Sequence, residues 1–297
     1  MNPASAAPGT ATGPAAFSTL ITAAELAQRI DTPDWVIFDC RFDLADAAFG
    51  RRAYGVGHLP GAFYLDVEDD LSGQKTGLNG RHPLPDPARL AATLARCGVR
   101  NTTQVVAYDD AGGMSAARLW WLLRWLGHHR VAVLDGGFQA WLTAAQPLST
   151  DTPGLNGEHD FHFALGPARV TSDYVLAHLG HPDMTVIDAR SPDRFRGENE
   201  LLDPVAGHIP GALNRFYRDN MDESGQFKPA PELRADFQAL LDGRDARDVV
   251  HNCGSGVSAC VNVLAMEVAG LSGSRLYAGS WSEWCADPSR PVATGPG

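Results

Sequence analysis

The sequence predicts an α/β protein made of two tandem domains, each a mainly parallel sheet with helices on both faces. Short apolar runs alternate with helix-like stretches, and these runs lack the apolar–polar alternation of a half-exposed strand. Strands of that kind are buried on both faces, as in a parallel sheet. In addition, four blocks of the first half recur in the second half in the same order, which indicates a duplicated domain.

Six short apolar runs are the expected strands of the two sheets, three in each half. They are residues 36–38, 105–107, 131–134, 186–187, 249–250 and 275–277. Apolar-rich residues 115–126 and their counterpart 257–269 are expected to form helices. Because parallel strands need a crossover connection between them, these helices are expected to cover the sheets.

The clearest repeated block is GHLPGA at residues 57–62, which returns as GHIPGA at residues 207–212. Because His58 and His208 stand in both copies, we expect them to fix a turn and not to take part in chemistry. Each copy is about 130 residues long, a usual size for a domain. The predicted parts are a disordered tail at 1–17, a first domain at 18–147, a linker at 148–168 and a second domain at 169–297.

Composition narrows the class of protein. Hydrophobic residues make up 44% of the chain, and no apolar run approaches the roughly 18–20 residues of a membrane span. A net charge of −11 argues against a nucleic-acid partner, which needs a cationic face. The five cysteines show no metal-ligand spacing and no disulfide framework. Because the first 16 residues also lack the features of a signal peptide, we expect a cytoplasmic protein without a metal or cofactor.

The strongest functional signal is Cys253, which follows an expected strand and opens the loop CGSGVS before a helix. Glycines at 254 and 256 allow successive backbone N–H groups to converge and form an anion-binding nest. The positive end of the following helix faces the same point, and together these groups favour a thiolate. The first copy has Asp109 at the matching position, so only the second copy is expected to carry a nucleophile.

Two other classes of cysteine enzyme do not fit this loop. A phosphatase of the Cys-x5-Arg type needs arginine at position 259, where this chain has Ala259, and without it phosphate lacks a bidentate partner. The local signature of papain-like proteases is also absent. A loop of backbone donors around a thiolate instead suits a persulfide, whose outer sulfur is anionic.

The chain resembles the tandem-domain rhodanese-like sulfurtransferases over residues 18–295. Its loop is similar to the CysGlySerGlyValThr loop of the 3-mercaptopyruvate sulfurtransferases, whereas the thiosulfate enzymes carry CysArgLysGlyValThr. The resemblance implies two rhodanese-like domains, an inactive first one, and two sets of site residues. The catalytic set is Cys253, Ser255, His82 and Glu68, and the substrate-binding set is Arg194, Arg190, Gly254, Gly256, Val257 and Ser258.

The resemblance also implies a reaction, in which sulfur passes from 3-mercaptopyruvate through a Cys253 persulfide to cyanide, a thiol or a thioredoxin-like acceptor, releasing pyruvate. Arg194 is expected to bind the carboxylate of the donor, whereas Arg190 can equally be a structural ion-pair partner. The sequence departs from the family at residues 199–204, which hold no arginine where many members have a second one. A thiosulfate:cyanide sulfurtransferase and a non-catalytic persulfide carrier therefore remain alternatives.

Overall fold

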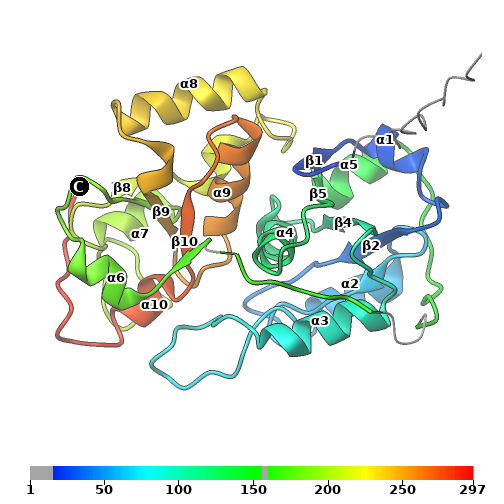
Figure 1. The fold of residues 1–297 in the computed structure, drawn as a ribbon, viewed down its shortest axis with the longest axis horizontal. Coiled ribbons are helices and arrows are strands. Elements are labelled where there is room, and N and C mark those ends of the chain that lie inside the picture. Colours follow the sequence, from blue (N-terminus) through cyan, green and yellow to red (C-terminus); the bar gives the residue numbers. More distant parts are fainter. Residues whose placement is uncertain (1–15, 156–159, 167, 297) are drawn as a thin grey trace, which may run out of the picture.

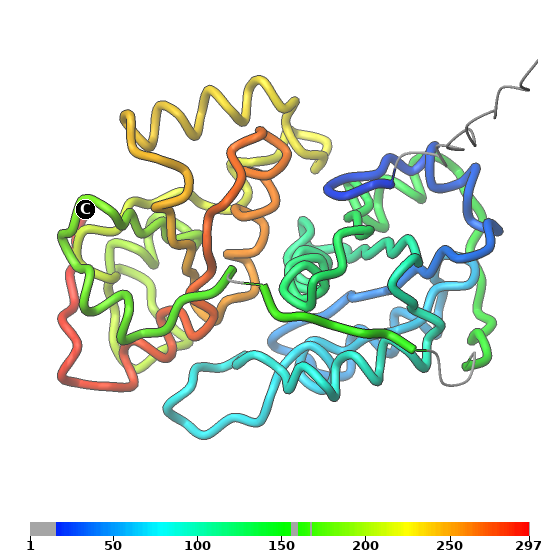
Figure 2. The backbone as a smooth tube through the Cα atoms, in the orientation of Figure 1, coloured from blue at the N-terminus to red at the C-terminus, as the bar shows by residue number. Residues whose placement is uncertain are grey.

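The computed structural model describes residues 16–155, 160–166 and 168–296, which form two α/β domains (Figure 1). Almost all of the expected tail lies outside these residues, but Phe17 packs edge-on against Trp35. Figure 2 shows that the chain between the domains passes close to their boundary, and the backbone of Ala164 and Gly166 bonds to the end of the central helix of the first domain. Within the described part of the chain, no helix is long and apolar enough to cross a membrane.

The first domain has a five-stranded, all-parallel sheet in the order β1-β5-β4-β2-β3. Its strands are β1 (Leu20–Ile21), β2 (Trp35–Asp39), β3 (Phe63–Tyr64), β4 (Gln104–Tyr108) and β5 (Val131–Leu134). Its helices are α1 (Ala23–Ala27), α2 (Phe49–Val56), α3 (Pro87–Arg96), α4 (Met114–Trp125) and α5 (Gly137–Thr143).

The second domain repeats this arrangement with the strand order β6-β10-β9-β7-β8, again all parallel. Its strands are β6 (Arg169–Val170), β7 (Thr185–Asp188), β8 (Leu213–Asn214), β9 (Val249–Asn252) and β10 (Arg275–Tyr277). Its helices are α6 (Ser172–Ala177), α7 (Pro192–Arg196), α8 (Ala230–Leu241), α9 (Ala259–Val268), α10 (Ser280–Trp284) and the 3-10 turns η1 (Tyr217–Asn220) and η2 (Ala246–Asp248). The matching order confirms the predicted duplication.

Alternate residues of the central strands pack into different cores, which explains why apolar residues are adjacent in these strands. In β4, Val105 and Ala107 belong to the core beneath α3 and α4, whereas Val106 belongs to the core beneath α1 and α5. In β9, Val249 faces α8 and α9, and Val250 faces α6, α7 and α10. Helices therefore cover both faces of each sheet, as predicted.

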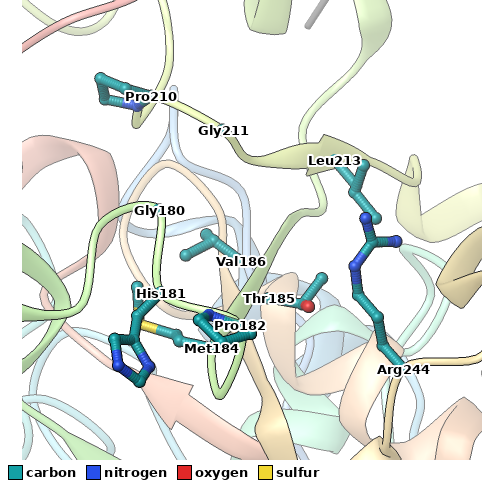
Figure 3. Close-up of a pocket in the computed structure, with 10 residues that line it drawn as sticks. All are labelled: Gly180, His181, Pro182, Met184, Thr185, Val186, Pro210, Gly211, Leu213 and Arg244. Carbon is teal, nitrogen blue, oxygen red and sulfur yellow. The ribbon is translucent and has the colours of Figure 1, made fainter.

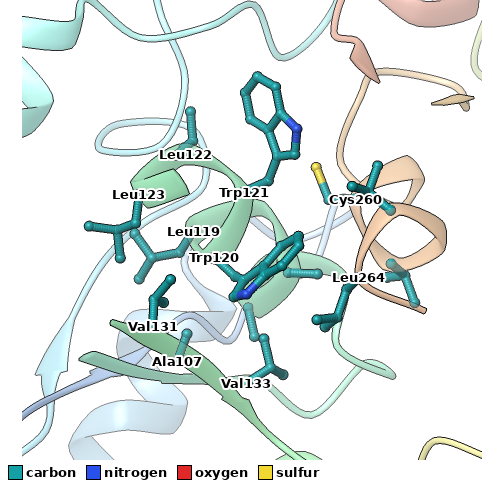
Figure 4. Close-up of a cluster of buried hydrophobic side chains, with 14 of the residues drawn as sticks. Ala107, Leu119, Trp120, Trp121, Leu122, Leu123, Val131, Val133, Cys260 and Leu264 are labelled. Atoms are coloured by element: carbon teal, nitrogen blue, oxygen red, sulfur yellow. The ribbon is translucent and has the colours of Figure 1, made fainter. Parts of the chain in front are cut away.

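The two domains share one buried core, centred on α4 and α9 (Figure 4). In Figure 4 the ring of Trp120 lies between α4 and Leu264, and Trp121 lines one hollow together with Val263 and Glu267 of α9. Trp120, Trp121, Cys260 and Leu264 are all almost fully buried. The tryptophans therefore pack between the domains. Cys260 likewise packs there, and its Sγ contacts the Gly256 carbonyl oxygen at 3.4 Å.

The predicted strands are all present, and the helix expected at 115–126 is α4, shifted by one residue at each end. The helix expected at 257–269 begins later, at Ala259, because Gly256 has a left-handed backbone (φ +78°) and the chain is still turning at this point. The edge strands β1, β3, β6 and β8 were not predicted. Each is two residues long, which is too short for a periodic signal.

Candidate active site

Cys253 directly follows β9 and therefore lies at the carboxyl edge of the second sheet, where open α/β sheets bind ligands. It lines a cavity of about 350 Å³ and is only 1% exposed. Phe42, His82 and Met114 of the first domain line the same cavity. Both domains therefore build the site, although only one supplies the cysteine.

One backbone N–H of the loop after Cys253 contacts the sulfur, and a side chain accepts a hydrogen bond from the backbone of Cys253 itself. The Gly256 N–H donates to Cys253 Sγ at 3.1 Å, and the Cys253 N–H donates to Ser280 Oγ at 3.1 Å. Gly256 is required here because an added Cβ would lie 2.1 Å from the Ala278 carbonyl oxygen, and because its φ is +78°. Among the predicted loop residues, Gly254, Val257 and Ser258 line the cavity, whereas Gly256 acts through its N–H.

The structure brings together the three other residues predicted for catalysis. Ser255 Oγ lies 2.7 Å from His82 Nδ1, and His82 Nε2 lies 3.1 Å from Glu68 Oε1. Glu68 also pairs with Lys75 at 2.5 Å. Burial acts to raise the pKa of Glu68, but the contacts with Lys75 and His82 outweigh it, so the pKa is lowered. The carboxylate of Glu68 is therefore charged at neutral pH. His82 Nε2 must then carry the proton, and Nδ1 accepts the hydrogen bond of the Ser255 hydroxyl.

Burial of the His82 ring is the main cause of a pKa lowered to about 4, and the nearby Arg118 and Lys75 act in the same direction against the attraction of Glu68. His82 is therefore neutral at pH 7. A neutral ring can accept a proton from Ser255 and return it, which a permanently protonated ring could not do.

Stability should depend on this histidine in acid. The pKa of His82 is about 4 in the folded protein and about 6.5 in the unfolded chain, so the unfolded chain binds the proton first as pH falls. The contribution of His82 to the free energy of unfolding is therefore fully present above pH 6.5 and is lost as pH falls toward 4. Between pH 6.5 and 4, we expect the unfolding free energy of His82→Gln to fall by about 2–3 kcal/mol less than that of the wild type, because the variant lacks this titrating group. Urea titrations at a series of pH values would measure it, with exposed His181→Gln as the control. Equal pH slopes in the three proteins would contradict the assignment.

Arg194 is the predicted carboxylate-binding residue, and its guanidinium lies at the cavity beside the loop. Both Nη atoms are 3.6 Å from the position that a Cβ on Gly254 would occupy. The side chain is 22% exposed and pairs with Glu200 at 2.8 Å and Asp203 at 3.5 Å. Two buried carboxylates therefore hold this cation in place at the cavity wall.

Arg190 has a different environment, although it also lines the cavity. It forms a bidentate ion pair with Asp188, at 2.7 Å for the closest contact, and donates to a backbone carbonyl oxygen. Arg41 makes the same contacts with Asp39 and a backbone carbonyl oxygen in the first domain, which has no cysteine at its loop. The geometry favours the ion-pair alternative for Arg190, because the same pair braces the sheet edge in both copies, and its binding of substrate stays a prediction.

Sequence reasoning missed Arg118, a fully buried arginine of α4. Its Nη1 donates to the Gly256 carbonyl oxygen at 3.1 Å, and its Nη2 donates to the His82 carbonyl oxygen at 3.0 Å. It thus ties the cysteine loop of one domain to the histidine segment of the other. The available signal was Arg118, one of two arginines within the apolar run 115–126, because an unpaired arginine is costly to bury.

The corresponding loop of the first domain shows what such a nest binds. The Asp109 carboxylate accepts four backbone hydrogen bonds of 2.8–2.9 Å, from Ala111, Gly113, Ser115 and Ala116. Burial raises the pKa of Asp109 against these bonds. The nest is therefore filled by a covalently attached acid in the first domain, and the second domain has a cysteine sulfur at the equivalent position.

Replacing Asp109 by asparagine should destabilise the fold without removing activity. The amide nitrogen would face two N–H donors and leave them unpaired, and we expect a loss of about 2–4 kcal/mol of unfolding free energy. Chemical denaturation would measure this loss, and kcat for sulfur transfer should stay within a few fold. Asp110→Asn, at the exposed neighbouring carboxylate, is the matched control. An unchanged midpoint for Asp109→Asn would refute the role of the filled nest.

Another cavity, of about 220 Å³, lies in the second domain beside Thr185 and Arg244 (Figure 3). Thr185 is the first residue of β7, so this hollow is at the amino end of the strand, away from Cys253. Its lining includes no cysteine, aspartate or glutamate. In the described residues, no group of three His, Cys, Asp or Glu side chains could hold a metal ion. The chemistry of the described residues is therefore concentrated at Cys253.

The fold and the site define a tandem α/β protein whose cysteine loop is completed by a histidine, a carboxylate and arginines from both domains. The family model of the rhodanese-like domain matches residues 22–144 and again residues 171–287. The chain therefore belongs to the rhodanese-like family.

Its relatives differ in the sulfur donor that their names give. A Pseudomonas aeruginosa protein named as a probable 3-mercaptopyruvate sulfurtransferase is 48% identical over 93% of this chain and 98% of its own. SseB of Mycobacterium tuberculosis, whose name assigns it to the thiosulfate sulfurtransferases, is 44% identical over 93% of this chain and 97% of its own. The crystal structure of the 3-mercaptopyruvate sulfurtransferase SseA from Escherichia coli has a TM-score of 0.76 and 32% identity, covering 89% of this chain and 99% of that one.

Proposed function

We propose that this protein is a 3-mercaptopyruvate sulfurtransferase that passes sulfur through a persulfide on Cys253 to a thiophilic acceptor. The observation that carries the proposal is the geometry of the loop. Cys253 Sγ accepts a backbone hydrogen bond, and the cationic Arg194 lies beside the loop at Gly254. This position suits 3-mercaptopyruvate, whose carboxylate lies a few ångströms from the sulfur that is transferred. The similarity to named 3-mercaptopyruvate sulfurtransferases supports the same donor.

In the first half-reaction, the Cys253 thiolate attacks the thiol sulfur of the donor, whose carboxylate is bound by Arg194. A sulfur–sulfur bond forms, and the electrons of the breaking carbon–sulfur bond leave on carbon as the enolate of pyruvate. Ser255 takes the proton of the donor thiol while its own proton moves to neutral His82 Nδ1. The returning proton converts the enolate to pyruvate and leaves an anionic persulfide on the enzyme.

In the second half-reaction, cyanide, a small thiol or a thioredoxin-like protein attacks the outer sulfur and releases the Cys253 thiolate. Backbone N–H groups of the loop stabilise the anionic sulfur between the two steps, in the manner of an oxyanion hole. The five unpaired cysteines are compatible with a reducing, cytoplasmic setting for these acceptors.

The deciding experiment compares kcat/KM for 3-mercaptopyruvate with that for thiosulfate, with cyanide as the common acceptor and thiocyanate as the product. We expect a preference for mercaptopyruvate of at least about 100-fold, because Arg194 lies beside Gly254, where it can bind a carboxylate a few ångströms from the transferred sulfur, and thiosulfate has no such group. An equal or reversed preference would reject mercaptopyruvate as the donor.

A second candidate is a thiosulfate:cyanide sulfurtransferase, which the likeness to SseB favours. Saturation by thiosulfate at low concentration would support it. The non-catalytic carrier is distinguished by mass spectrometry, since a carrier would gain no sulfur on Cys253 from either free donor, whereas the enzyme gains one sulfur from its own donor.

A further inference from the structure

Arg81, next to the relay histidine, reaches from the first domain to the second. Its backbone N–H donates to Ser282 Oγ at 3.0 Å, and its guanidinium Nη1 forms an ion pair with Asp203. The side chain is 24% exposed and lines the same cavity as Cys253. Both the backbone and the side chain of Arg81 are thus fixed by the domain that carries the nucleophile.

The free end of Arg81 lies over the cysteine loop. Its Nη2 is 2.7 Å from the position that a Cβ on Gly254 would occupy, so a side chain there would displace the Arg81 guanidinium. Arg194 Nη1 and Nη2 are 3.6 Å from the same point. Two guanidiniums, one from each domain, therefore meet above the residue that follows Cys253.

Asp203 holds this pair of cations together. Its carboxylate contacts Arg81 through one oxygen and Arg194 through the other, and the side chain is only 3% exposed. Within the described residues, Arg81 Nη2 has no acceptor, whereas Nη1 is taken by Asp203. An anion that enters the cavity can therefore bind Nη2 without displacing the acid.

We propose that Arg81 is a specificity-determining residue that binds the donor carboxylate together with Arg194, so that the two domains clamp the substrate between them. The inference rests on the proposed function. It also accounts for the absence of a second arginine at residues 199–204: the first domain supplies that cation, and Asp203 of the same segment positions it.

The first test is Arg81→Gln in the full chain, with steady-state kinetics for both substrates. Removing a charged hydrogen bond to the carboxylate should raise KM for 3-mercaptopyruvate about 10- to 100-fold. Because Arg81 makes no contact with Cys253 Sγ, kcat should change by less than threefold, and so should KM for a neutral thiol acceptor such as 2-mercaptoethanol. Arg81→Lys should recover part of the donor affinity.

Further variants separate substrate contact from charge balance and from domain packing. Arg81→Gln/Asp203→Asn leaves the net charge of the cavity unchanged, and Asp203→Asn alone measures the effect of losing the Arg194 contact. A donor KM that is higher in the double variant than in Asp203→Asn therefore supports direct contact of Arg81 with the donor. Recovery of the wild-type KM would overturn the proposal, because Arg81 would then only neutralise Asp203.

Arg124→Gln is the control for domain packing, because it removes another ion pair between the domains, Arg124–Glu267 at 3.3 Å. The Arg124 side chain is also 24% exposed, but it lies outside the cavity that contains Cys253. An equal rise in KM for Arg124→Gln would also overturn the proposal.

Failure of the inference and failure of the proposed function look different. If the donor assignment is wrong, the wild-type protein itself shows no preference for 3-mercaptopyruvate over thiosulfate. If only the role of Arg81 is wrong, the wild type prefers 3-mercaptopyruvate, with a measurable KM, and Arg81→Gln has the same KM.

Discussion

Cys253→Ser should abolish sulfur transfer from 3-mercaptopyruvate while the protein remains folded. A serine hydroxyl cannot accept the sulfur as a persulfide, and we expect kcat to fall by at least about 10⁴-fold, as when other catalytic nucleophiles are removed. The replacement is close in size, and its hydroxyl can still accept the Gly256 N–H that now reaches Cys253 Sγ at 3.1 Å. Thiocyanate production and the thermal midpoint measure the two effects separately.

Cys260→Ser is the matched control for this experiment. Cys260 is also fully buried, and burial raises the pKa of its thiol to about 12, so it is not a thiolate at neutral pH. We expect its variant to keep turnover and to carry one added sulfur after incubation with the donor, whereas the Cys253 variant carries none. If the sulfur stayed after Cys253→Ser, the persulfide would have to reside on another cysteine.

The sequence was sufficient to predict the central strands of both sheets but not the edge strands. β4 and β9 are buried on both faces, so adjacent apolar residues, 105–107 in β4 and 249–250 in β9, stand out from the surrounding helices. The two-residue edge strands β3 and β8 form only where the neighbouring strand offers its backbone, as in the pairing of Phe38 with Phe63. No local pattern of two residues can encode such a pairing.

The site residues that belong to a recognisable sequence motif could be predicted from the sequence. Cys253 and its glycines follow from the loop, and the resemblance located His82 and Glu68, which lie at hydrogen-bonding distance from each other. Arg81 and Arg118 could not be predicted in the same way, because their roles depend on contacts between domains. Their partners lie 122 and 138 residues away in sequence.

Duplication explains how one domain can serve the other. In the first domain the nest is occupied by the Asp109 carboxyl group, which accepts hydrogen bonds from the backbone N–H groups there. In the second domain the nest faces a sulfur whose charge depends on the reaction. The first domain therefore provides rigid walls, His82 and Arg81, while only the second nest is free to hold a transferred atom.

The second large effect is expected for Gly256→Ala, which should impair both folding and catalysis. The new Cβ would lie 2.1 Å from the Ala278 carbonyl oxygen, a backbone atom that cannot rotate away, so the loop must shift. We expect a loss of about 2–4 kcal/mol of unfolding free energy from the clash and the positive φ together. The shift moves the N–H that contacts Cys253 Sγ, and kcat should fall by about 100- to 1,000-fold, as for the loss of an oxyanion-hole donor.

Gly211→Ala separates the clash from the backbone strain. Gly211 has the same φ of +78°, but a Cβ there would meet nothing within 4 Å. Its variant should lose only about 1–2 kcal/mol, the cost of the left-handed backbone, and should keep its kcat. If the two variants were equally stable and equally active, the contact of Gly256 with Ala278 would not define the loop, and the nest would have to tolerate a side chain next to the nucleophile. If only Gly256→Ala loses activity, the close approach of the two backbones is what aims the loop N–H at the sulfur.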